Sequence, residues 1–220
     1  MRMRKKPNLA ARMEKCANML VAEPEKLRGM WLDEFGYDEL HIELGCGKGR
    51  FTVETAKAEA ATTSGVTAGT GTVFIAALEK SADAMIVAVE RAAAVDLRNI
   101  RFVNGYAEHL TKLFAPCEAS RIYLNFCDPW PSNRHSKRRL TNRRFVELYL
   151  QILKTGGEIH FKTDNLSLFE YSLREFSSSG LGLLEVTRDL HRDGPAGVMT
   201  DYEQKFYDQG LPIHRCIACK

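Results

Sequence analysis

The chain has 220 residues, of which 45% are apolar and 27% charged, and its formal net charge is +3. These values are typical of one globular domain spanning residues 1–220, and they exclude a protein that is basic as a whole or small enough to need a disulfide framework. No stretch approaches the ~20 apolar residues of a membrane-spanning helix, and no apolar run of signal length begins the chain, so we expect a cytoplasmic protein with no membrane contact.

Positive charge is concentrated in two short stretches of the chain. Residues 1–16 contain six Lys and Arg against the single acid Glu14, and a second cationic run covers residues 134–144. Such local patches attract phosphates even when the total charge is small. We therefore treat residues 1–20 as a basic N-terminal arm, with little fixed structure over 1–8 and a short helix over 10–20.

Strands and helices alternate through the first half of the chain. Residues 24–35 look irregular or weakly helical, with Trp31, Leu32 and Phe35 docked on the main body. Apolar runs and helical periodicity predict strands over 40–44, 73–78 and 100–103 and helices over 50–60, 82–94 and 108–114. Residues 61–72 are almost all Ala, Thr, Ser and Gly, which predicts a long loop.

The second half continues the same alternation. We predict strands over 121–126, 158–163, 183–187 and 213–219, helices over 142–153 and 166–177, and a polar loop over 190–200 that leads into 201–208. Thr141 is the expected N-cap of the helix over 142–153, and Gly156-Gly157 is expected to end it.

This order of elements predicts an α/β fold. We expect an open, mostly parallel twisted sheet with helices on both faces and an antiparallel strand near the C-terminus. Ligands of such sheets bind beyond the carboxyl ends of the strands, where the strand order reverses. The residues expected there are Glu43 with its glycines, Glu79, Tyr106, Asp128 and Asp164.

A glycine turn follows the first predicted strand, in the sequence Glu43-Leu44-Gly45-Cys46-Gly47-Lys48-Gly49. Its G-x-G-x-G spacing differs from the G-x-G-x-x-G dinucleotide fingerprint, and an acid before it would repel a pyrophosphate. Glu79, at the end of the second strand, is placed to accept hydrogen bonds from both ribose hydroxyls of a nucleoside. Together the two features favour an adenosyl ligand over a nicotinamide dinucleotide.

Residues 125–141 join a carboxylate to a block of positive charge. Asp128 follows an apolar strand, two prolines stiffen the turn around Trp130, and no acid occurs between Asp128 and Glu147. The pattern suggests a reaction centre beside a polyanion. A solvated helix start after an ordinary turn is the alternative interpretation.

These motifs resemble the S-adenosylmethionine-dependent methyltransferases of the Rossmann-like class, and more narrowly the bacterial tRNA (guanine-N7-)-methyltransferase family. The similarity includes residues 41–49, 128–141, 161–165, 200–203 and 210–213. It implies methyl transfer to N7 of a guanosine in the tRNA variable loop, with S-adenosylmethionine as cofactor and tRNA as partner. N7 carries an in-plane lone pair and no proton, so alignment and electrostatics are the expected means of catalysis.

The resemblance also implies roles for individual residues. Asp128 is the candidate catalytic residue. Cofactor-binding positions are Glu43, Gly45, Gly47, Glu79, Lys80, Tyr106, Ala107 and Asp128. Substrate-binding positions are Ser132, Arg134, Lys137, Arg138, Arg139, Asp164, Thr200, Asp201, Tyr202 and Glu203.

Two residues depart from the family pattern. Tyr106 stands where an acid or asparagine that contacts adenine is usual, and Ser132 stands where a substrate-binding lysine is usual. These departures keep open an alternative, a tRNA-binding protein on a methyltransferase scaffold with little or no turnover. We expect no metal site, because Cys216 and Cys219 have no second pair to complete one. Monomer and homodimer both remain open.

Overall fold

The computed structural model describes residues 5–63 and 72–220, so most of the predicted loop over 61–72 lies outside the described part. Its centre is a seven-stranded sheet with the order β3-β2-β1-β4-β5-β7-β6. The strands are β1 (Glu39–Leu44), β2 (Val73–Glu79), β3 (Ile100–Asn104), β4 (Ala119–Asn125), β5 (Leu153–Thr163), β6 (Gly182–Thr187) and β7 (His214–Cys219). Only β7 runs against its neighbours, which confirms the predicted mostly parallel sheet with an antiparallel strand near the C-terminus.

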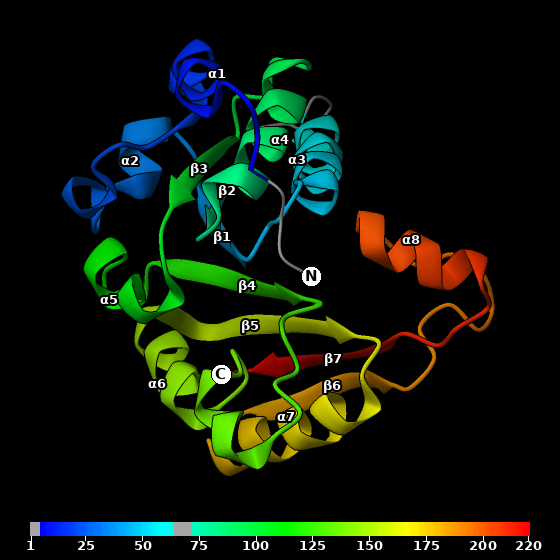
Figure 1. Ribbon diagram of the computed structural model, residues 1–220. Helices are drawn as coiled ribbons and strands as arrows, with labels where there is room; N and C mark the ends of the chain where they lie inside the picture. Colours follow the sequence, from blue (N-terminus) through cyan, green and yellow to red (C-terminus); the bar gives the residue numbers. More distant parts are fainter. Residues whose placement is uncertain (1–4, 64–71) are drawn as a thin grey trace.

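Helices cover both faces of this sheet (Figure 1). The α-helices are α1 (Leu9–Lys15), α2 (Trp31–Phe35), α3 (Arg50–Thr63), α4 (Ala82–Ala93), α5 (Leu110–Leu113), α6 (Arg143–Ile152), α7 (Leu166–Ser178) and α8 (Asp201–Asp208). Side chains of α2, α5, α6 and α7 share one apolar cluster, and those of α1, α3 and α4 share the other. Alternation along β1 explains the division, because Leu40, Ile42 and Leu44 face the first cluster while His41 and Glu43 face α3.

Two predicted boundaries after residue 140 were wrong. The N-cap of α6 is Asn142, which accepts a hydrogen bond from Arg144 N, whereas Thr141 is buried and accepts one from Ser172. Helix α6 ends at Ile152, and Leu153 already pairs with Ala119 as the start of β5. The pair Gly156-Gly157 therefore lies inside β5 and does not end the helix.

The N-terminal segment is more ordered than expected. Its helix is α1, which is shorter than the predicted 10–20, and it packs against α4. Arg12 makes two hydrogen bonds of 2.7 Å to Glu90 of that helix, and Val21 N donates to Phe102 O of β3. The structure describes nothing before Lys5, so part of the predicted arm lies outside it.

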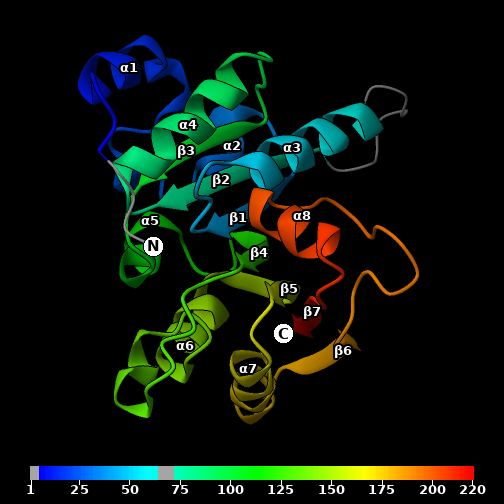
Figure 2. The ribbon, with the colours of Figure 1, turned by 45° about the vertical axis from the view of Figure 1, so that its right-hand side comes forward.

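Helix α8 was not predicted. Thr200 caps it by accepting a hydrogen bond from Glu203 N, and the Glu203 side chain accepts one from Thr200 N, which completes a capping box. The two views place α8 beyond the carboxyl ends of β4 and β5 and beside α3 (Figures 1 and 2). It therefore forms a wall at the sheet edge where β1 and β4 lie side by side and the strand order reverses.

Candidate functional site

A pocket of about 260 Å³ opens at the carboxyl edge of the sheet, between the glycine turn and α8. Its walls come from segments far apart in the sequence: the end of β1, the start of α3, the end of β4 and the start of α8. The residues lining it include Glu43, Gly45, Gly47, Phe51, Asn125, Phe126, Thr200, Asp201 and Tyr202. Six of the lining residues are ones that the sequence predicts to bind cofactor or substrate: Glu43, Gly45, Gly47, Thr200, Asp201 and Tyr202.

The glycine turn forms one wall of this pocket. Gly45 has φ +78°, and a side chain there would meet no other atom within 4 Å, so its backbone lies open to a ligand. At Gly49 the reason is different, because an added Cβ would lie 2.4 Å from the Cβ of Ala88 in α4. The turn thus combines an exposed backbone with a close contact between α3 and α4.

Glu79 braces this turn from the end of β2. Its carboxylate accepts hydrogen bonds from Gly47 N at 3.0 Å and from Ser81 N at 2.8 Å, and the residue is 8% exposed. A carboxylate has about four acceptor positions. Two therefore remain for ribose hydroxyls, which fits the cofactor-binding role predicted for Glu79.

Glu43 lies deeper, at the end of β1. Its carboxyl group accepts hydrogen bonds from the Thr52 hydroxyl and from Asn125 Nδ2. Burial raises its pKa to about 7, although the hydrogen bonds from Thr52 and Asn125 and the nearby Lys162 oppose the rise. Glu43 can thus change its charge near neutral pH when a cation enters the pocket.

The raised pKa of Glu43 predicts a pH-dependent stability. The unfolded chain releases this proton near pH 4.5 and the folded protein only near pH 7. Glu43 therefore contributes stability below pH 4.5 that is lost as the pH rises through 7. The free energy of unfolding of Glu43→Gln, relative to wild type, should rise by up to roughly 3 kcal/mol between pH 5 and pH 8. Chemical denaturation at both pH values measures it, and a constant difference would contradict the assignment.

Asp128 lies just past β4, on the open side of the same edge. Its side chain is 69% exposed, and Lys80 Nζ, after the end of β2, lies 3.9 Å from one carboxylate oxygen. Tyr106, after β3, is 55% exposed and packs edge-on against His109, and Ala107 follows it at the start of a 3-10 turn. None of these four residues lines the 260 Å³ pocket, but all follow the carboxyl ends of β2, β3 or β4.

The turn around Asp128 is held in an unusual backbone conformation. Phe126 and Trp130 have φ values of +52° and +41°, which non-glycine residues seldom adopt. Arg139 holds this turn, because its guanidinium donates to Pro129 O and Trp130 O and stacks on Tyr171. Such strain close to a predicted catalytic residue indicates a turn whose shape is fixed by its surroundings.

The cationic run therefore divides into two parts. Arg139 is 7% exposed and supports the turn from inside, so it offers no free charge to a phosphate. Ser132, Arg134, Lys137 and Arg138 are exposed, and Arg138 lies over the Trp130 ring at 4.9 Å. The sequence does not reveal this division, because the burial of a single arginine depends on tertiary contacts.

Four further substrate-binding candidates lie around the start of α8 and the end of β5. Tyr202 packs against Phe126, with ring centroids 5.2 Å apart, and its hydroxyl lies 3.5 Å from an oxygen of Asp164. Asp201 pairs with Arg91 of α4 at 2.7 Å, and Thr200 is occupied as the N-cap. Tyr202 is 46% exposed, so its ring is available to a base.

Glu203, the fifth candidate on this segment, faces the interior. It is completely buried and forms an ion pair with Lys162 of β5 at 2.7 Å. Burial lowers the pKa of Lys162, and Glu203 opposes that shift. Neither Lys162 nor His191, which also contacts Glu203, was predicted as a site residue. One sequence signal for a helix starting here was available, because the spacing Thr200-x-x-Glu203 is that of a capping box.

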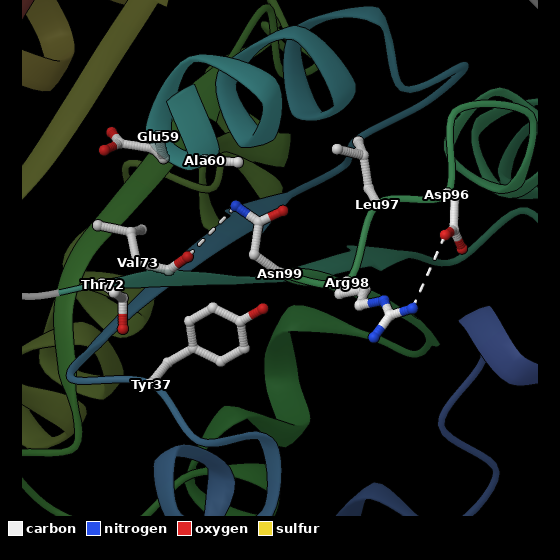
Figure 3. Close-up of a pocket in the computed structure, with 9 residues that line it drawn as sticks. All are labelled: Tyr37, Glu59, Ala60, Thr72, Val73, Asp96, Leu97, Arg98 and Asn99. Atoms are coloured by element: carbon white, nitrogen blue, oxygen red, sulfur yellow. Dashed lines mark hydrogen bonds and ion pairs between the residues drawn. The ribbon is translucent and has the colours of Figure 1, made fainter. Parts of the chain in front are cut away.

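A larger pocket lies away from these residues. It has a volume of about 460 Å³ and includes Tyr37, Val73 and Asn99, at the amino ends of β2 and β3 (Figure 3). None of the predicted site residues lines it.

Within residues 5–63 and 72–220, no group of three or more His, Cys, Asp or Glu side chains is arranged to hold a metal ion. No helix in that part of the chain is long and apolar enough to cross a membrane.

Solved structures with the same arrangement of elements are methyltransferases. The 16S rRNA methyltransferase KamB has a TM-score of 0.61 at 15% identity, covering 90% of this chain and 92% of its own. A SAM-dependent methyltransferase from Aquifex aeolicus has a TM-score of 0.54 at 14% identity, covering 94% and 97%. The sheet order, the glycine turn and the strand-end acids thus define a Rossmann-like methyltransferase fold.

Sequence comparison identifies the family. Residues 38–216 match the family model described as "Putative methyltransferase". The tRNA (guanine-N(7)-)-methyltransferase of Geobacillus sp. (strain WCH70) is 43% identical over 218 residues, covering 98% of this chain and 94% of the relative. That of Bacillus velezensis (strain DSM 23117 / BGSC 10A6 / LMG 26770 / FZB42) is 42% identical, covering 98% and 95%. The chain belongs to the tRNA (guanine-N7-)-methyltransferase family, as its motifs predict.

Proposed function

We propose that this protein transfers a methyl group from S-adenosylmethionine to N7 of a guanosine in the tRNA variable loop. The names of its full-length relatives support the reaction. The observation that carries it for this chain is the common position of three features at one sheet edge. These are the glycine-turn pocket, the carboxylate of Asp128 and the exposed cations that follow it.

The residues at the glycine turn fit S-adenosylmethionine. The open backbone of Gly45 and Gly47 admits the ligand closely, and Glu79 has acceptor positions left for the ribose hydroxyls. Glu43, at the base of the pocket, suits the charged methionine end, either directly or through water. Tyr106 offers an exposed ring to the adenine, and we assign the matching hydrogen-bond donor to the Ala107 amide. Lys80 completes the set, beside Asp128.

Asp128 is the catalytic residue of this proposal. Bound S-adenosylmethionine supplies a methyl group on a positively charged sulfur. Guanine N7 would attack the methyl carbon with its own lone pair while the S–CH3 bond breaks and its electron pair returns to sulfur, which leaves as a neutral thioether, so no side chain has to remove a proton. Positive charge then develops on the purine, and a fixed carboxylate next to the ring stabilises it. Asp128 can also hold the base by accepting hydrogen bonds from its N1–H and amino groups.

The guanine is held from the side of α8. A base in a folded tRNA has to leave its stack to reach such a pocket. The exposed ring of Tyr202 is the surface on which it stacks, and Asp164, Thr200 and Asp201 provide polar groups around its edge. Ser132, Arg134, Lys137 and Arg138 form the neighbouring track for tRNA phosphates. Because the proposed substrate is tRNA, we expect the reaction to take place in the cytoplasm.

The phosphate track predicts a change in salt dependence. Lys137→Ala with Arg138→Ala should raise the KM for tRNA and make the slope of log KM against log salt shallower, because fewer counterions are released on binding. Each lost phosphate contact should change that slope by roughly 0.7 to 0.9. The matched control is Lys26→Ala with Lys57→Ala, which removes two exposed lysines from other parts of the surface. Equal effects of both double variants would argue against a track.

Methyl transfer by the purified protein tests the reaction itself. With cofactor labelled in the methyl group, the protein should label tRNA that lacks modifications, and Asp128→Ala should label it far more slowly. Binding of cofactor and tRNA without label transfer would support the alternative of a tRNA-binding protein without turnover and would overturn this proposal.

A further inference from the structure

The carboxylate of Glu203 is saturated by groups of the protein itself. Lys162 Nζ donates to both oxygens, at 3.0 and 2.7 Å, His191 Nε2 lies 3.0 Å from Oε1, and Thr200 N donates to Oε2 at 3.2 Å. These four contacts use the four acceptor positions of a carboxylate. Since Glu203 is also 0% exposed, it has neither surface nor acceptor positions left for a tRNA base.

The contacts of Glu203 connect three segments that are distant in sequence. Lys162 is in β5, His191 follows β6, and Glu203 is in the first turn of α8. Lys162 Nζ also donates to Val198 O at 3.0 Å, and Ala196 N donates to His191 Nδ1 at 3.2 Å. Because Nδ1 accepts, the hydrogen-bond pattern assigns the proton to Nε2, which donates to Glu203. The loop over 190–200 is therefore joined to the sheet through one buried carboxylate.

The hydrogen-bond network around Glu203 lies directly beside the pocket at the glycine turn. Thr200, Asp201 and Tyr202 directly precede Glu203 and line the pocket at the glycine turn. Lys162 lies 5.1 Å from the ring of Phe51, which lines the same pocket from α3. Two polar ties of α8, from Arg91 to Asp201 and from Arg50 to Gln204, are more exposed to water. Exposed pairs hold a segment weakly, whereas breaking a buried pair leaves an uncompensated charge.

We propose that Glu203, Lys162 and His191 are positioning residues, which fix the start of α8 so that Tyr202 and its neighbours form the guanine-binding wall. Glu203 acts on tRNA through α8 and not by contact. This inference rests on the proposed function for its effect on tRNA. Its structural part, the fixing of residues 198–205, does not depend on any activity.

A double-mutant cycle separates positioning from contact. Glu203→Gln and Lys162→Met should each raise the KM for tRNA about tenfold or more, with a smaller change in the dissociation constant of S-adenosylmethionine. The double variant should be no worse than the worse single variant, because both changes break one pair. If Glu203 touched tRNA directly, Lys162→Met would leave the KM near the wild-type value and the effects would multiply, which would overturn the proposal. Asp208→Asn is the matched control, an exposed acid removed from the same helix.

Hydrogen exchange measures the structural part without tRNA or turnover. In Glu203→Gln the amides of residues 198–205 should exchange at least tenfold faster than in wild type, while those of β1, β4 and β5 change little. Unchanged exchange over 198–205 would overturn the positioning role. A variant that loses protection throughout would overturn it as well, because Glu203 would then support the whole fold. If wild type lacks methyl transfer but shows the local exchange effect, the proposed function fails and the positioning role stands.

Discussion

Asp128→Ala should reduce kcat for tRNA methylation by roughly 10²- to 10³-fold, the usual effect of removing one group that stabilises transition-state charge. The KM for tRNA should change far less, because Asp128 is one group beside a whole track of cations. Binding of S-adenosylmethionine should also change little, since the Asp128 side chain is 69% exposed and its ion pair with Lys80 spans 3.9 Å. Single-turnover kinetics with saturating tRNA isolates the chemical step from binding and product release.

Three variants control this experiment. Asp128→Asn keeps an acceptor of the same shape and loses the charge, so it reports the electrostatic part of the effect. Lys80→Met removes the exposed ion pair with Asp128 together with a proposed cofactor contact, so it should weaken binding of S-adenosylmethionine but leave kcat at saturating cofactor near the wild-type value. Asp96→Ala removes an exposed acid that is not part of the site. Equal losses of kcat and tRNA affinity in Asp128→Ala would show that Asp128 binds the substrate without assisting the transfer.

Glu79→Ala should raise the dissociation constant of S-adenosylmethionine by roughly 10²- to 10⁴-fold, because two hydrogen bonds to a charged group are lost. Hydrogen bonds to a charged group contribute ~1.5–3 kcal/mol each, and this substitution removes those expected to the ribose. It also leaves Gly47 N and Ser81 N without their carboxylate acceptor, so the glycine turn loses its brace. Titration calorimetry on the protein without tRNA measures the constant directly.

Asp83→Ala is the matched control for Glu79→Ala. Asp83 is in the first turn of α4, close to Glu79 in sequence, but its carboxylate accepts from Lys6 N and not from the glycine turn. Its removal should leave cofactor binding within about twofold of wild type. Similar losses in both variants would point to a general effect of negative charge at this edge and would argue against a specific ribose contact.

Much of the fold could be predicted because its elements have strong local signals. Helix α4 repeats Met85, Ile86 and Val89 at helical spacing, and β1 and β2 are short apolar runs that end in an acid or a glycine turn. The boundary between α6 and β5 could not be predicted in the same way. Leu153 reads as the last apolar residue of a helix, and only its pairing with Ala119 makes it the first residue of a strand.

Six of the predicted site residues line one pocket at the glycine turn, but how deeply each predicted residue is buried could not be predicted from the sequence. Arg138 and Arg139 are adjacent cations in one run, yet one is exposed over Trp130 and the other is buried beneath the same turn. Glu203 follows Tyr202 in one motif, yet the two residues face opposite environments. Burial of a charged group depends on partners from distant segments, such as Lys162 for Glu203, and a linear pattern does not encode those contacts.

We expect the methyl group to be transferred to N7 of a guanosine and to no other atom of the tRNA. Methylation at N7 gives the purine a fixed positive charge. The charged ring can then be chemically reduced, and the RNA strand can be cleaved at that nucleoside. Unmodified tRNA treated with the protein and S-adenosylmethionine should therefore acquire one new cleavage site, at a guanosine of the variable loop, and Asp128→Ala should delay it. A transferred methyl group without that cleavage, or cleavage at another position of the tRNA, would contradict this account.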